Sequence, residues 1–478
     1  MTQYSNYIDG EWVPGAEFTP NINPSDTSDV VGEYAHGTAT DVEAATAAAR
    51  DSFAEWSMST PQQRFDVLDA AGGQILARKT EVGRLLAREE GKPLAEAIGE
   101  VARAGQIFKF FAGETLRLTG DIVASVRPGL NVEMTREPLG VIGLITPWNF
   151  PIAIPAWKIA PALAYGNTVV IKPAELVPGC TWELVKILAD CGLPAGVLNL
   201  VMGKGTVVGD ALVKSPHVAA ISFTGSVATG RQLAVSCAER GKRVQAEMGG
   251  KNPMVVLDDA DLDLAVEACV NGAYYSTGQR CTASSRLVVT EGIHDRFVKA
   301  VKARLKVLHV GHALEEGTVI GPVVDQRQLD QDLEYIGVAR DEGGEVFGGE
   351  RRDRPTNGFY LAPALIIGTT NDMRINREEV FGPVASVVQV PDYAAALEVV
   401  NATNFGLTAG ICSTSLSRVS HFKRHAKAGM VMVNAPTAGV DYHVAFGGTK
   451  ASSYGPREQG TYAKEFYTVV KTTYVNAG

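Results

Sequence analysis

Five short apolar segments in the first half of the chain constrain its fold more than any other feature. Each contains β-branched residues, and the stretches between them carry apolar residues at helical spacing. The segments are residues 141–145, 168–171, 198–201, 218–223 and 243–248. Strands that alternate with helices in this way are typical of βαβ units, whose strands form one parallel sheet.

The same alternation returns after Pro253. The apolar, β-branched segments there are residues 255–257, 287–289, 385–390 and 430–434. A chain of 478 residues is also longer than one ordinary domain, which usually has about 100–200 residues. We therefore expect a second α/β domain.

Residues 1–120 predict mainly helices, because apolar residues recur at helical spacing behind start signals. Thr40 begins a candidate capping box before an alanine-rich run that extends to Trp56. Thr60 begins a second one, with Pro61 at the first helical position.

A hairpin is predicted at residues 121–137, where apolar and polar residues alternate on both sides of Pro128-Gly129. The final segment, residues 465–475, is β-rich and can pair with this hairpin within a subunit or across an interface. We expect these elements to form oligomer contacts.

Charge and composition exclude several classes of function. The chain has 44 Lys+Arg against 53 Asp+Glu, a net charge of −9, which argues against a nucleic-acid partner. The longest apolar stretch, residues 151–170, is interrupted by Lys158, Pro155 and Pro161, so it does not suit a membrane helix. The N-terminus lacks the pattern of a secretory signal, and the six cysteines form no CxxC pair or Cys/His cluster. We expect a cytoplasmic protein with reduced thiols and no metal site.

Cys281 is the cysteine best suited to be a nucleophile. It lies in a polar, glycine-containing stretch beside Arg280, whose positive charge favours a thiolate. The other five cysteines lie in apolar helical or strand contexts. Taken by itself, however, a single cysteine is more often a small buried side chain.

Glu247 and Asn149 follow predicted strands at the edge where open α/β sheets place ligands. Glu247 precedes two glycines and can act as a base toward water, or it only solvates the turn. The Asn149 amide can stabilise an oxyanion, or Asn149 only forms the turn before Phe150-Pro151.

Two other strand ends suit a dinucleotide. Residues 225–230 precede a predicted helix, so their amides can meet a pyrophosphate, although the pattern is not GxGxxG. Lys172 and Glu175 follow another strand, and a carboxylate there accepts hydrogen bonds from both ribose hydroxyls and repels a 2′-phosphate. The alternative is a solvated surface pair.

Seven motifs occur in a fixed order over most of the chain. They are TPWNFP (146–151), KPAE (172–175), FTGS (223–226), EMGGKNP (247–253), GQRCT (278–282), EEVFGP (378–383) and FGGTK (446–450). Together they closely resemble the NAD(P)-dependent aldehyde dehydrogenase superfamily. The resemblance implies an α/β aldehyde dehydrogenase fold in a homodimer or homotetramer. The implied parts are a Rossmann-like parallel-sheet NAD-binding domain (1–120 and 141–248), an α/β catalytic domain (249–450) and a β oligomerisation element (121–140 and 451–478).

The resemblance also implies four catalytic roles. Cys281 matches the nucleophile that attacks the aldehyde, giving a thiohemiacetal and then a thioester. Asn149, with the Cys281 backbone amide, matches the oxyanion hole, and Glu247 matches the base that activates water for hydrolysis. Lys158 matches a lysine of the family's proton path. Since the CoA-acylating members with which we compare this chain lack the residue matching Glu247, the expected product is a free acid.

NAD is the implied cofactor, with NADP as the alternative. Lys172 and Glu175 match residues at the adenine ribose, and Glu175 favours NAD. Ser226 matches a phosphate contact, and Glu379 and Phe381 match residues at the nicotinamide ribose and ring. The other cofactor-binding candidates are Thr146, Pro147, Trp148, Gly205, Phe223 and Gly225.

The substrate is constrained by longer stretches, residues 277–287, 428–450 and 452–460. They resemble the aldehyde dehydrogenases that oxidise 2,5-dioxopentanoate, also called 2-oxoglutarate semialdehyde. Arg280 can offer a fork to the carboxylate of such a substrate, or it only tunes the neighbouring thiol.

Relatives that oxidise succinate semialdehyde usually hold its carboxylate with two arginines at positions matching Trp157 and Tyr275, which are aromatic here. Thr437, Tyr442 and His443 lie in the loop that lines the substrate tunnel in relatives and are candidates for specificity. The tail motif carries an extra residue, so the resemblance transfers no role to its glutamate. The alternatives are a broad-range or succinate semialdehyde dehydrogenase, or a non-catalytic binding or structural member of the fold.

Overall fold

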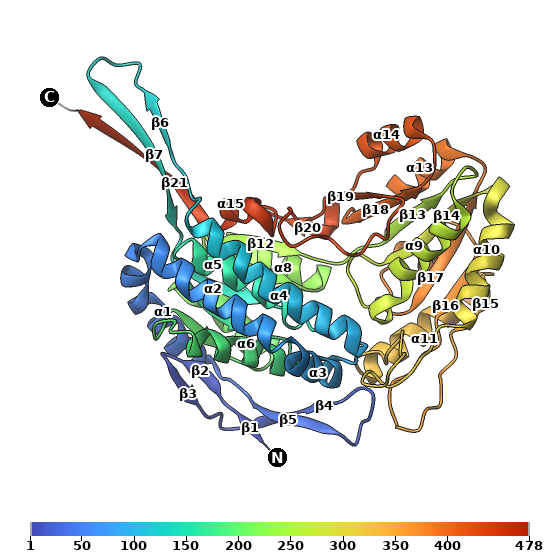
Figure 1. Ribbon diagram of the computed structural model, residues 1–478, viewed down its shortest axis with the longest axis horizontal. Coiled ribbons are helices and arrows are strands. Elements are labelled where there is room, and N and C mark those ends of the chain that lie inside the picture. Colours follow the sequence, from blue (N-terminus) through green and yellow to red (C-terminus); the bar gives the residue numbers. More distant parts are fainter. Residues whose placement is uncertain (1, 477–478) are drawn as a thin grey trace.

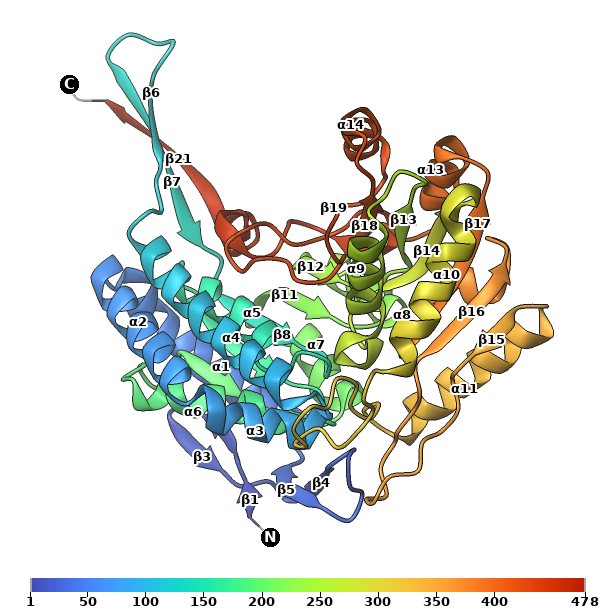
Figure 2. The same cartoon turned by 45° about the vertical axis from the view of Figure 1, so that its right-hand side comes forward.

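The chain folds into two α/β lobes and a long β arm, and the computed structural model describes residues 2–476. Figure 1 shows the two lobes side by side, with the arm extending away from the N-terminal lobe. The view in Figure 2, turned by 45°, shows the same separation between the arm and the second lobe.

The first lobe is built on an eight-stranded sheet with the order β20-β12-β11-β8-β9-β10-β2-β3. Its strands are β20 (Ser453–Tyr454), β12 (Arg243–Glu247), β11 (Val218–Thr224), β8 (Val141–Ile145), β9 (Thr168–Lys172), β10 (Leu198–Leu200), β2 (Asn6–Ile8) and β3 (Glu11–Val13). The strands from β12 to β10 pair in parallel. These five strands confirm the five segments predicted from the sequence.

Helices cover both faces of this sheet because successive strand residues point to opposite sides. Ile142 and Leu144 of β8 pack with the core of α2–α6, whereas Val141 and Ile145 pack with α1, α7 and α8. The helices are α1 (Ala39–Met58), α2 (Pro61–Ala77), α3 (Lys79–Glu90), α4 (Leu94–Thr115), α5 (Ala153–Ala164), α6 (Pro178–Asp190), α7 (Asp210–Lys214), preceded by the π-helical turn η1 (Gly205–Gly209), and α8 (Val227–Ala238). The long helix α4 packs against α2, α3 and α5.

The start of α2 confirms its predicted capping box, but the start of α1 differs. Thr60 caps α2 and exchanges hydrogen bonds with Gln63. The box of α1 is made by Thr38 and Asp41, so Thr40 lies inside the helix. The Asp41 carboxylate accepts a 2.7 Å hydrogen bond from the Thr38 backbone N–H. Thr38, and not Thr40, is therefore the N-cap residue of α1.

The prediction of helices is wrong for residues 3–35, which form five short strands. β2 and β3 extend the eight-stranded sheet, where Tyr7 pairs with Leu200. The other three, β1 (Gln3–Tyr4), β5 (Val30–Ala35) and β4 (Phe18–Ile22), form a separate sheet. Part of this structure depends on pairing with β10, which is remote in the sequence, and local periodicity does not report such pairing.

The second lobe contains a seven-stranded sheet with the order β15-β16-β17-β14-β13-β18-β19. Its strands are β15 (Glu345–Phe347), β16 (Ala364–Thr369), β17 (Val384–Val390), β14 (Ser284–Thr290), β13 (Asn252–Val256), β18 (Thr408–Cys412) and β19 (Met430–Val433). All neighbours pair in parallel except β15 with β16. The four predicted segments correspond to β13, β14, β17 and β19, so the second α/β unit is confirmed.

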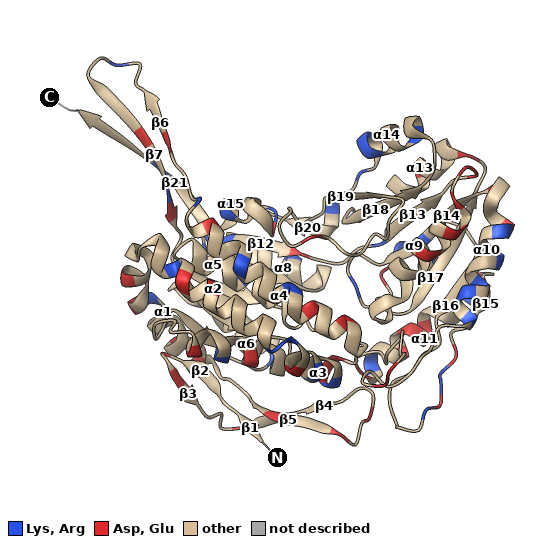
Figure 3. Cartoon of the chain, in the orientation of Figure 1, with Lys and Arg blue, Asp and Glu red and all other residues tan. Residues whose placement is uncertain are grey.

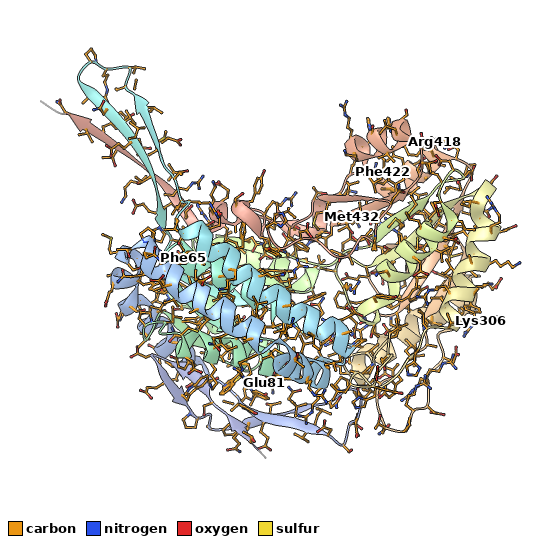
Figure 4. The ribbon with its side chains drawn as sticks, in the orientation of Figure 1. Phe65, Glu81, Lys306, Arg418, Phe422 and Met432 are labelled. Carbon is orange, nitrogen blue, oxygen red and sulfur yellow. The ribbon has the colours of Figure 1, made fainter. Side chains whose placement is uncertain are left out.

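Helices also flank the second sheet. They are α9 (Leu262–Tyr274), followed by the 3₁₀ turn η2 (Tyr275–Gly278), α10 (Glu291–Lys306), α11 (Gln326–Asp341), α12 (Arg374–Arg377), α13 (Tyr393–Asn401) and α14 (Leu416–His425). Phe422 of α14 is fully buried in the core beside β13 and β18. Figure 4 shows Phe422 and Met432 of β19 at the same corner of this lobe.

The arm confirms the predicted hairpin and its pairing with the C-terminal strand. The hairpin consists of β6 (Asp121–Ala124) and β7 (Leu130–Pro138), and β21 (Thr468–Asn476) pairs antiparallel with β7 along its whole length within the same chain. The described part of the predicted 451–478 segment, residues 451–476, does not act as one element, because β20 pairs with β12 in the large sheet and only β21 enters the arm. The turns η3 (Lys450–Ser452) and η4 (Gly460–Ala463) and the helix α15 (Lys464–Tyr467) complete this segment.

Acidic and basic residues are interspersed over the helices of both lobes (Figure 3). Within residues 2–476, no helix is both long enough and apolar enough to cross a membrane.

Candidate active site

Two strand ends and one loop bring three of the predicted catalytic residues together. Asn149 follows β8, Glu247 ends β12, and the loop that carries Cys281 precedes β14 of the other sheet. The Asn149 side-chain amide donates a 2.9 Å hydrogen bond to the backbone carbonyl of Gln279, two residues before Cys281. The negative charge of Glu247 also acts on Cys281. The site therefore joins the carboxyl edge of the first sheet to the second lobe.

The Cys281 loop is held by side chains from the second lobe. The Asn252 amide donates to the backbone carbonyls of Cys281 (2.7 Å) and Ala283 (3.0 Å). The Thr437 hydroxyl donates a 2.7 Å hydrogen bond to the Thr282 carbonyl. Gly250 leaves room for this loop, since a Cβ there would lie 2.8 Å from the Cys281 carbonyl oxygen. These contacts restrict where the thiol can lie.

Cys281 is the partly exposed cysteine of this site, and its surroundings disfavour the thiolate. Burial raises the pKa of the thiol to about 12, and the negative charges of Glu379 and Glu247 add to the increase. The backbone N–H groups of Cys281 and Thr282 oppose the increase by hydrogen bonding to the sulfur. A thiolate here is stabilised when positive charge enters the site or the neighbouring carboxylates are neutralised.

Asn149 is positioned by a buried ion pair that the sequence motifs did not reveal. Lys92 donates hydrogen bonds to the Glu100 carboxylate (2.6 Å) and to the Asn149 backbone carbonyl (2.7 Å). Glu100 in turn accepts hydrogen bonds from the N–H groups of Ile152 and Ala153 at the start of α5. Burial lowers the pKa of Lys92, but the carboxylates of Glu100 and Glu90 outweigh it and raise the pKa overall. The pair fixes the loop that presents the Asn149 amide.

Glu247 is a buried carboxyl group with one oxygen free. Its Oε2 accepts a 2.5 Å hydrogen bond from the Ser453 hydroxyl, whereas its buried Oε1 has no partner. Burial raises the pKa of Glu247 well above its usual range, the charge of Glu458 adds to this, and Ser453 opposes it. A carboxyl group with a raised pKa and a free oxygen is suited to exchange a proton with water.

Lys158 is fully buried and forms an ion pair with Glu458, a residue to which the sequence analysis assigned no role. The ammonium group donates to Glu458 Oε1 and to the hydroxyl of Ser222 on β11 (2.7 Å). Burial lowers the pKa of Lys158, and the charges of Glu458 and Glu247 oppose this. The resemblance transferred no role to Glu458 because the tail motif carries an extra residue. The Glu458 backbone pairs with that of Phe446, and this pairing brings the Glu458 side chain into the site.

Two predicted cofactor residues meet across the lobes. The rings of Trp148 and Phe381 are 5.3 Å apart and perpendicular, and Phe381 has a φ of 68°, a backbone conformation that is rare for a large side chain. Glu379 accepts a 2.7 Å hydrogen bond from the Gly250 N–H. Burial raises its pKa to about 7, while this bond and Lys251 oppose the increase. A pocket lined by Gly250, Gly278 and Arg280 lies between the Cys281 loop and residues 379–382.

The remaining cofactor candidates lie on the first lobe. Lys172 ends β9, and burial lowers its pKa to about 8 against the charge of the exposed Glu175. Ser226 caps α8 through the Thr229 N–H, and Gly205 begins η1 on the surface. Thr146, Pro147, Phe223 and Gly225 complete the set, at the ends of β8 and β11.

This edge fits a dinucleotide. The first turn of α8 provides unpaired N–H groups for a phosphate. The Thr146 hydroxyl is buried without a hydrogen-bond partner, as expected of a group that awaits a ligand. Gly225 permits the chain to turn closely around Phe223, because a Cβ at Gly225 would lie 2.6 Å from that ring.

The residues predicted to bind the substrate differ in burial. Trp157 is buried against Phe446, with ring centroids 5.3 Å apart, and Thr437, after β19, is fully buried against the Cys281 loop. His443 is exposed, and its ring contacts Tyr442.

Two substrate candidates are engaged elsewhere. The Arg280 guanidinium forms a 2.6 Å ion pair with Glu96 of α4, which also accepts hydrogen bonds from Ser276. The Arg280 guanidinium is therefore already paired with a carboxylate of the protein and is not free to bind a carboxylate of the substrate. Tyr275 packs on the core of the second lobe, where it contributes, after Glu267, to the raised pKa of Arg304.

The described residues contain no group of three or more His, Cys, Asp or Glu side chains placed to hold a metal ion. All six cysteines are free thiols.

Comparisons with known proteins agree with this geometry. The model of the aldehyde dehydrogenase family matches residues 12–473. The alpha-ketoglutaric semialdehyde dehydrogenase of Bacillus subtilis is 43% identical over 99% of this chain and 98% of its own length. The 2,5-dioxopentanoate dehydrogenase of Saccharolobus solfataricus is 40% identical over 99% of both chains.

A solved structure is also similar. The betaine aldehyde dehydrogenase of Staphylococcus aureus in complex with NAD+ superposes with a TM-score of 0.97, at 34% identity, over 99% of this chain and 95% of that chain. Together with the family match over residues 12–473, this establishes that the chain belongs to the aldehyde dehydrogenase family.

Proposed function

We propose that this enzyme oxidises 2,5-dioxopentanoate to the corresponding dicarboxylic acid with NAD, through covalent chemistry at Cys281. The observation that carries the proposal is the convergence of Cys281, Asn149 and Glu247, which the Asn149–Gln279 hydrogen bond joins across the two lobes. Relatives whose names specify this aldehyde cover nearly the whole chain, which supports the substrate.

The first step is attack of the Cys281 sulfur on the aldehyde carbon. The thiol gives its proton to the Glu247 carboxylate, a carbon–sulfur bond forms, and the carbonyl π electrons move to the oxygen, which becomes an alkoxide. An amide NH₂ has two hydrogens, so Asn149 holds the Gln279 carbonyl with one and offers the other to this oxygen. The hydrogen bond to the Gln279 carbonyl thus orients the Asn149 amide for its second hydrogen bond, to the alkoxide.

NAD, when bound, supplies the hydride acceptor and a positively charged ring. The residues proposed to hold it are the aromatic pair Trp148–Phe381, Glu379, Ser226 at the start of α8, and the Lys172–Glu175 turn. Glu175 favours NAD over NADP because a carboxylate repels a 2′-phosphate.

Loss of hydride leaves a thioester on Cys281, which water then hydrolyses. Glu247 takes a proton from this water through its free Oε1, the oxygen adds to the thioester carbon, and the sulfur leaves. The product is a free acid. Lys158 and Glu458 form the next layer of ionisable groups behind Glu247, and we infer that they carry protons away from it.

We infer a homodimer or homotetramer assembled through the arm. Ile122 and Val123 on β6 and Val470 and Tyr474 on β21 are exposed apolar residues. Such residues along a projecting strand pair mark an association surface. Light scattering of the purified protein measures the mass, and a monomer would contradict this assignment. The charge pattern and free cysteines support a cytoplasmic enzyme.

The deciding experiment compares kcat/KM for 2,5-dioxopentanoate, succinate semialdehyde and pentanal, each with NAD and with NADP, by NADH or NADPH formation. We expect 2,5-dioxopentanoate with NAD to give the highest value. Equal use of pentanal would leave a broad-range aldehyde dehydrogenase, and a preference for succinate semialdehyde would indicate the shorter substrate. No reduction of either cofactor with any aldehyde would favour a non-catalytic member of the family.

A further inference from the structure

Arg103 on α4 is a guanidinium near the site that no carboxylate holds. Its Nε is buried and has no hydrogen-bond partner, and NH2 donates a 3.2 Å hydrogen bond to the neutral side chain of Gln459. Within residues 2–476, no carboxylate lies within ion-pair distance of it. Because buried donors in native proteins are almost always paired, this guanidinium requires an explanation.

Arg103 lies beside the Trp157 ring and within electrostatic range of Cys281. Its Cζ is 5.8 Å from the centre of the Trp157 ring, which in turn packs against Phe446. Burial lowers the pKa of Arg103, whereas the charges of Glu100, Asp441 and Cys281 oppose this, so the guanidinium and the thiol lie within electrostatic range of one another. The Arg103 side chain is only partly buried overall, which leaves part of it open to a ligand.

Three other cations around Asn149 and Cys281 are already neutralised. Arg280 is bound by Glu96, Lys92 by Glu100, and Lys158 by Glu458. A carboxylate brought by the substrate would have to break one of these pairs. Arg103 alone among these four needs no such exchange.

We propose that Arg103 binds the terminal carboxylate of the aldehyde substrate and so determines the preference for carboxylate-bearing aldehydes. The planar guanidinium offers paired N–H donors that match a carboxylate, and the Trp157 ring packs along the carbon chain between the carboxylate and the aldehyde. Gln459 holds the guanidinium in place without neutralising it. The inference rests on the proposed function, because it requires a substrate with a carboxylate.

The test is the ratio of kcat/KM for 2,5-dioxopentanoate to kcat/KM for pentanal, measured with wild type and Arg103→Met. Hydrogen bonds to charged groups contribute enough that we expect the ratio to fall by about 10- to 150-fold, mainly through a higher KM for 2,5-dioxopentanoate. Both values come from one preparation, so incomplete folding does not change the ratio. Arg103→Lys keeps the charge without the fork and should recover part of the preference.

Two matched variants locate the effect. Lys109→Met removes another positive charge from α4, but Lys109 is paired with Asp69, so the ratio should stay at the wild-type value. Arg280→Met should lower kcat/KM for both aldehydes alike, because Arg280 positions the loop through Glu96. A loss of preference in Arg280→Met but not in Arg103→Met would overturn the inference, as would an equal loss in Lys109→Met.

The inference and the proposed function fail in different ways. If wild type prefers 2,5-dioxopentanoate and Arg103→Met keeps that preference, Arg103 does not bind the carboxylate and the proposed substrate stands. If wild type shows no preference over pentanal, the proposed substrate fails and the inference fails with it.

Discussion

Breaking the buried Lys158–Glu458 ion pair should lower the free energy of unfolding of the protein. Lys158 is 0% exposed and Glu458 is 5% exposed, so neither charge is solvated by water. Removing one partner of a buried pair leaves an uncompensated charge and typically costs about 3–5 kcal/mol. We expect Glu458→Leu and Lys158→Met each to lower the free energy of unfolding by this amount, measured by urea denaturation with fluorescence and circular dichroism.

The double variant Lys158→Met/Glu458→Leu separates charge from packing. Replacing a whole buried ion pair by apolar side chains of similar volume is often neutral or stabilising, so the double variant should recover most of the lost stability. Ser222 remains satisfied there, since its hydroxyl also donates to Gln245 at 2.7 Å. Single variants that lose under about 1 kcal/mol, or a double variant as unstable as the sum of both, would refute the reasoning.

Four further predictions concern the chemistry. Cys281→Ala should abolish NADH formation, whereas Glu247→Gln should give one burst of NADH and then slow turnover; an unchanged steady-state rate in Glu247→Gln would remove its hydrolytic role. Asn149→Ala should lower kcat by about 10²–10³, as loss of one oxyanion donor does in other enzymes, and an effect under about tenfold would contradict the assignment. Because the pKa of Glu247 is raised and its carboxylate is the active form, thioester hydrolysis should increase with pH well above the ordinary glutamate value of 4.5, and a rate that levels off near 4.5 would argue against this environment.

Much of the fold follows from local pattern. The parallel strands of the first lobe were predictable because most are short, largely apolar segments between amphipathic helices, and the hairpin was predictable from alternation around Pro128-Gly129. The strands at residues 3–35 were not, because β2 depends on pairing with β10, which is far away in the chain. Periodicity reports which side of an element is apolar, not which distant segment covers it.

The motifs also identified the family and singled out Cys281, Glu247 and Asn149, since Glu247 and Asn149 lie at strand ends and Cys281 lies in a polar, glycine-containing loop. Tertiary structure alone decided which charges are paired. Arg280 looked free in the sequence, yet its partner Glu96 lies 184 residues away, and Lys158 meets Glu458 across 300 residues. Arg103 stands in an ordinary helical context and is distinctive only because the fold surrounds it with Trp157 and Gln459 and leaves its charge without a partner. The chemistry of a side chain depends on its neighbours in space. The sequence therefore identifies the reactive groups, whereas their charge partners are determined by the tertiary structure.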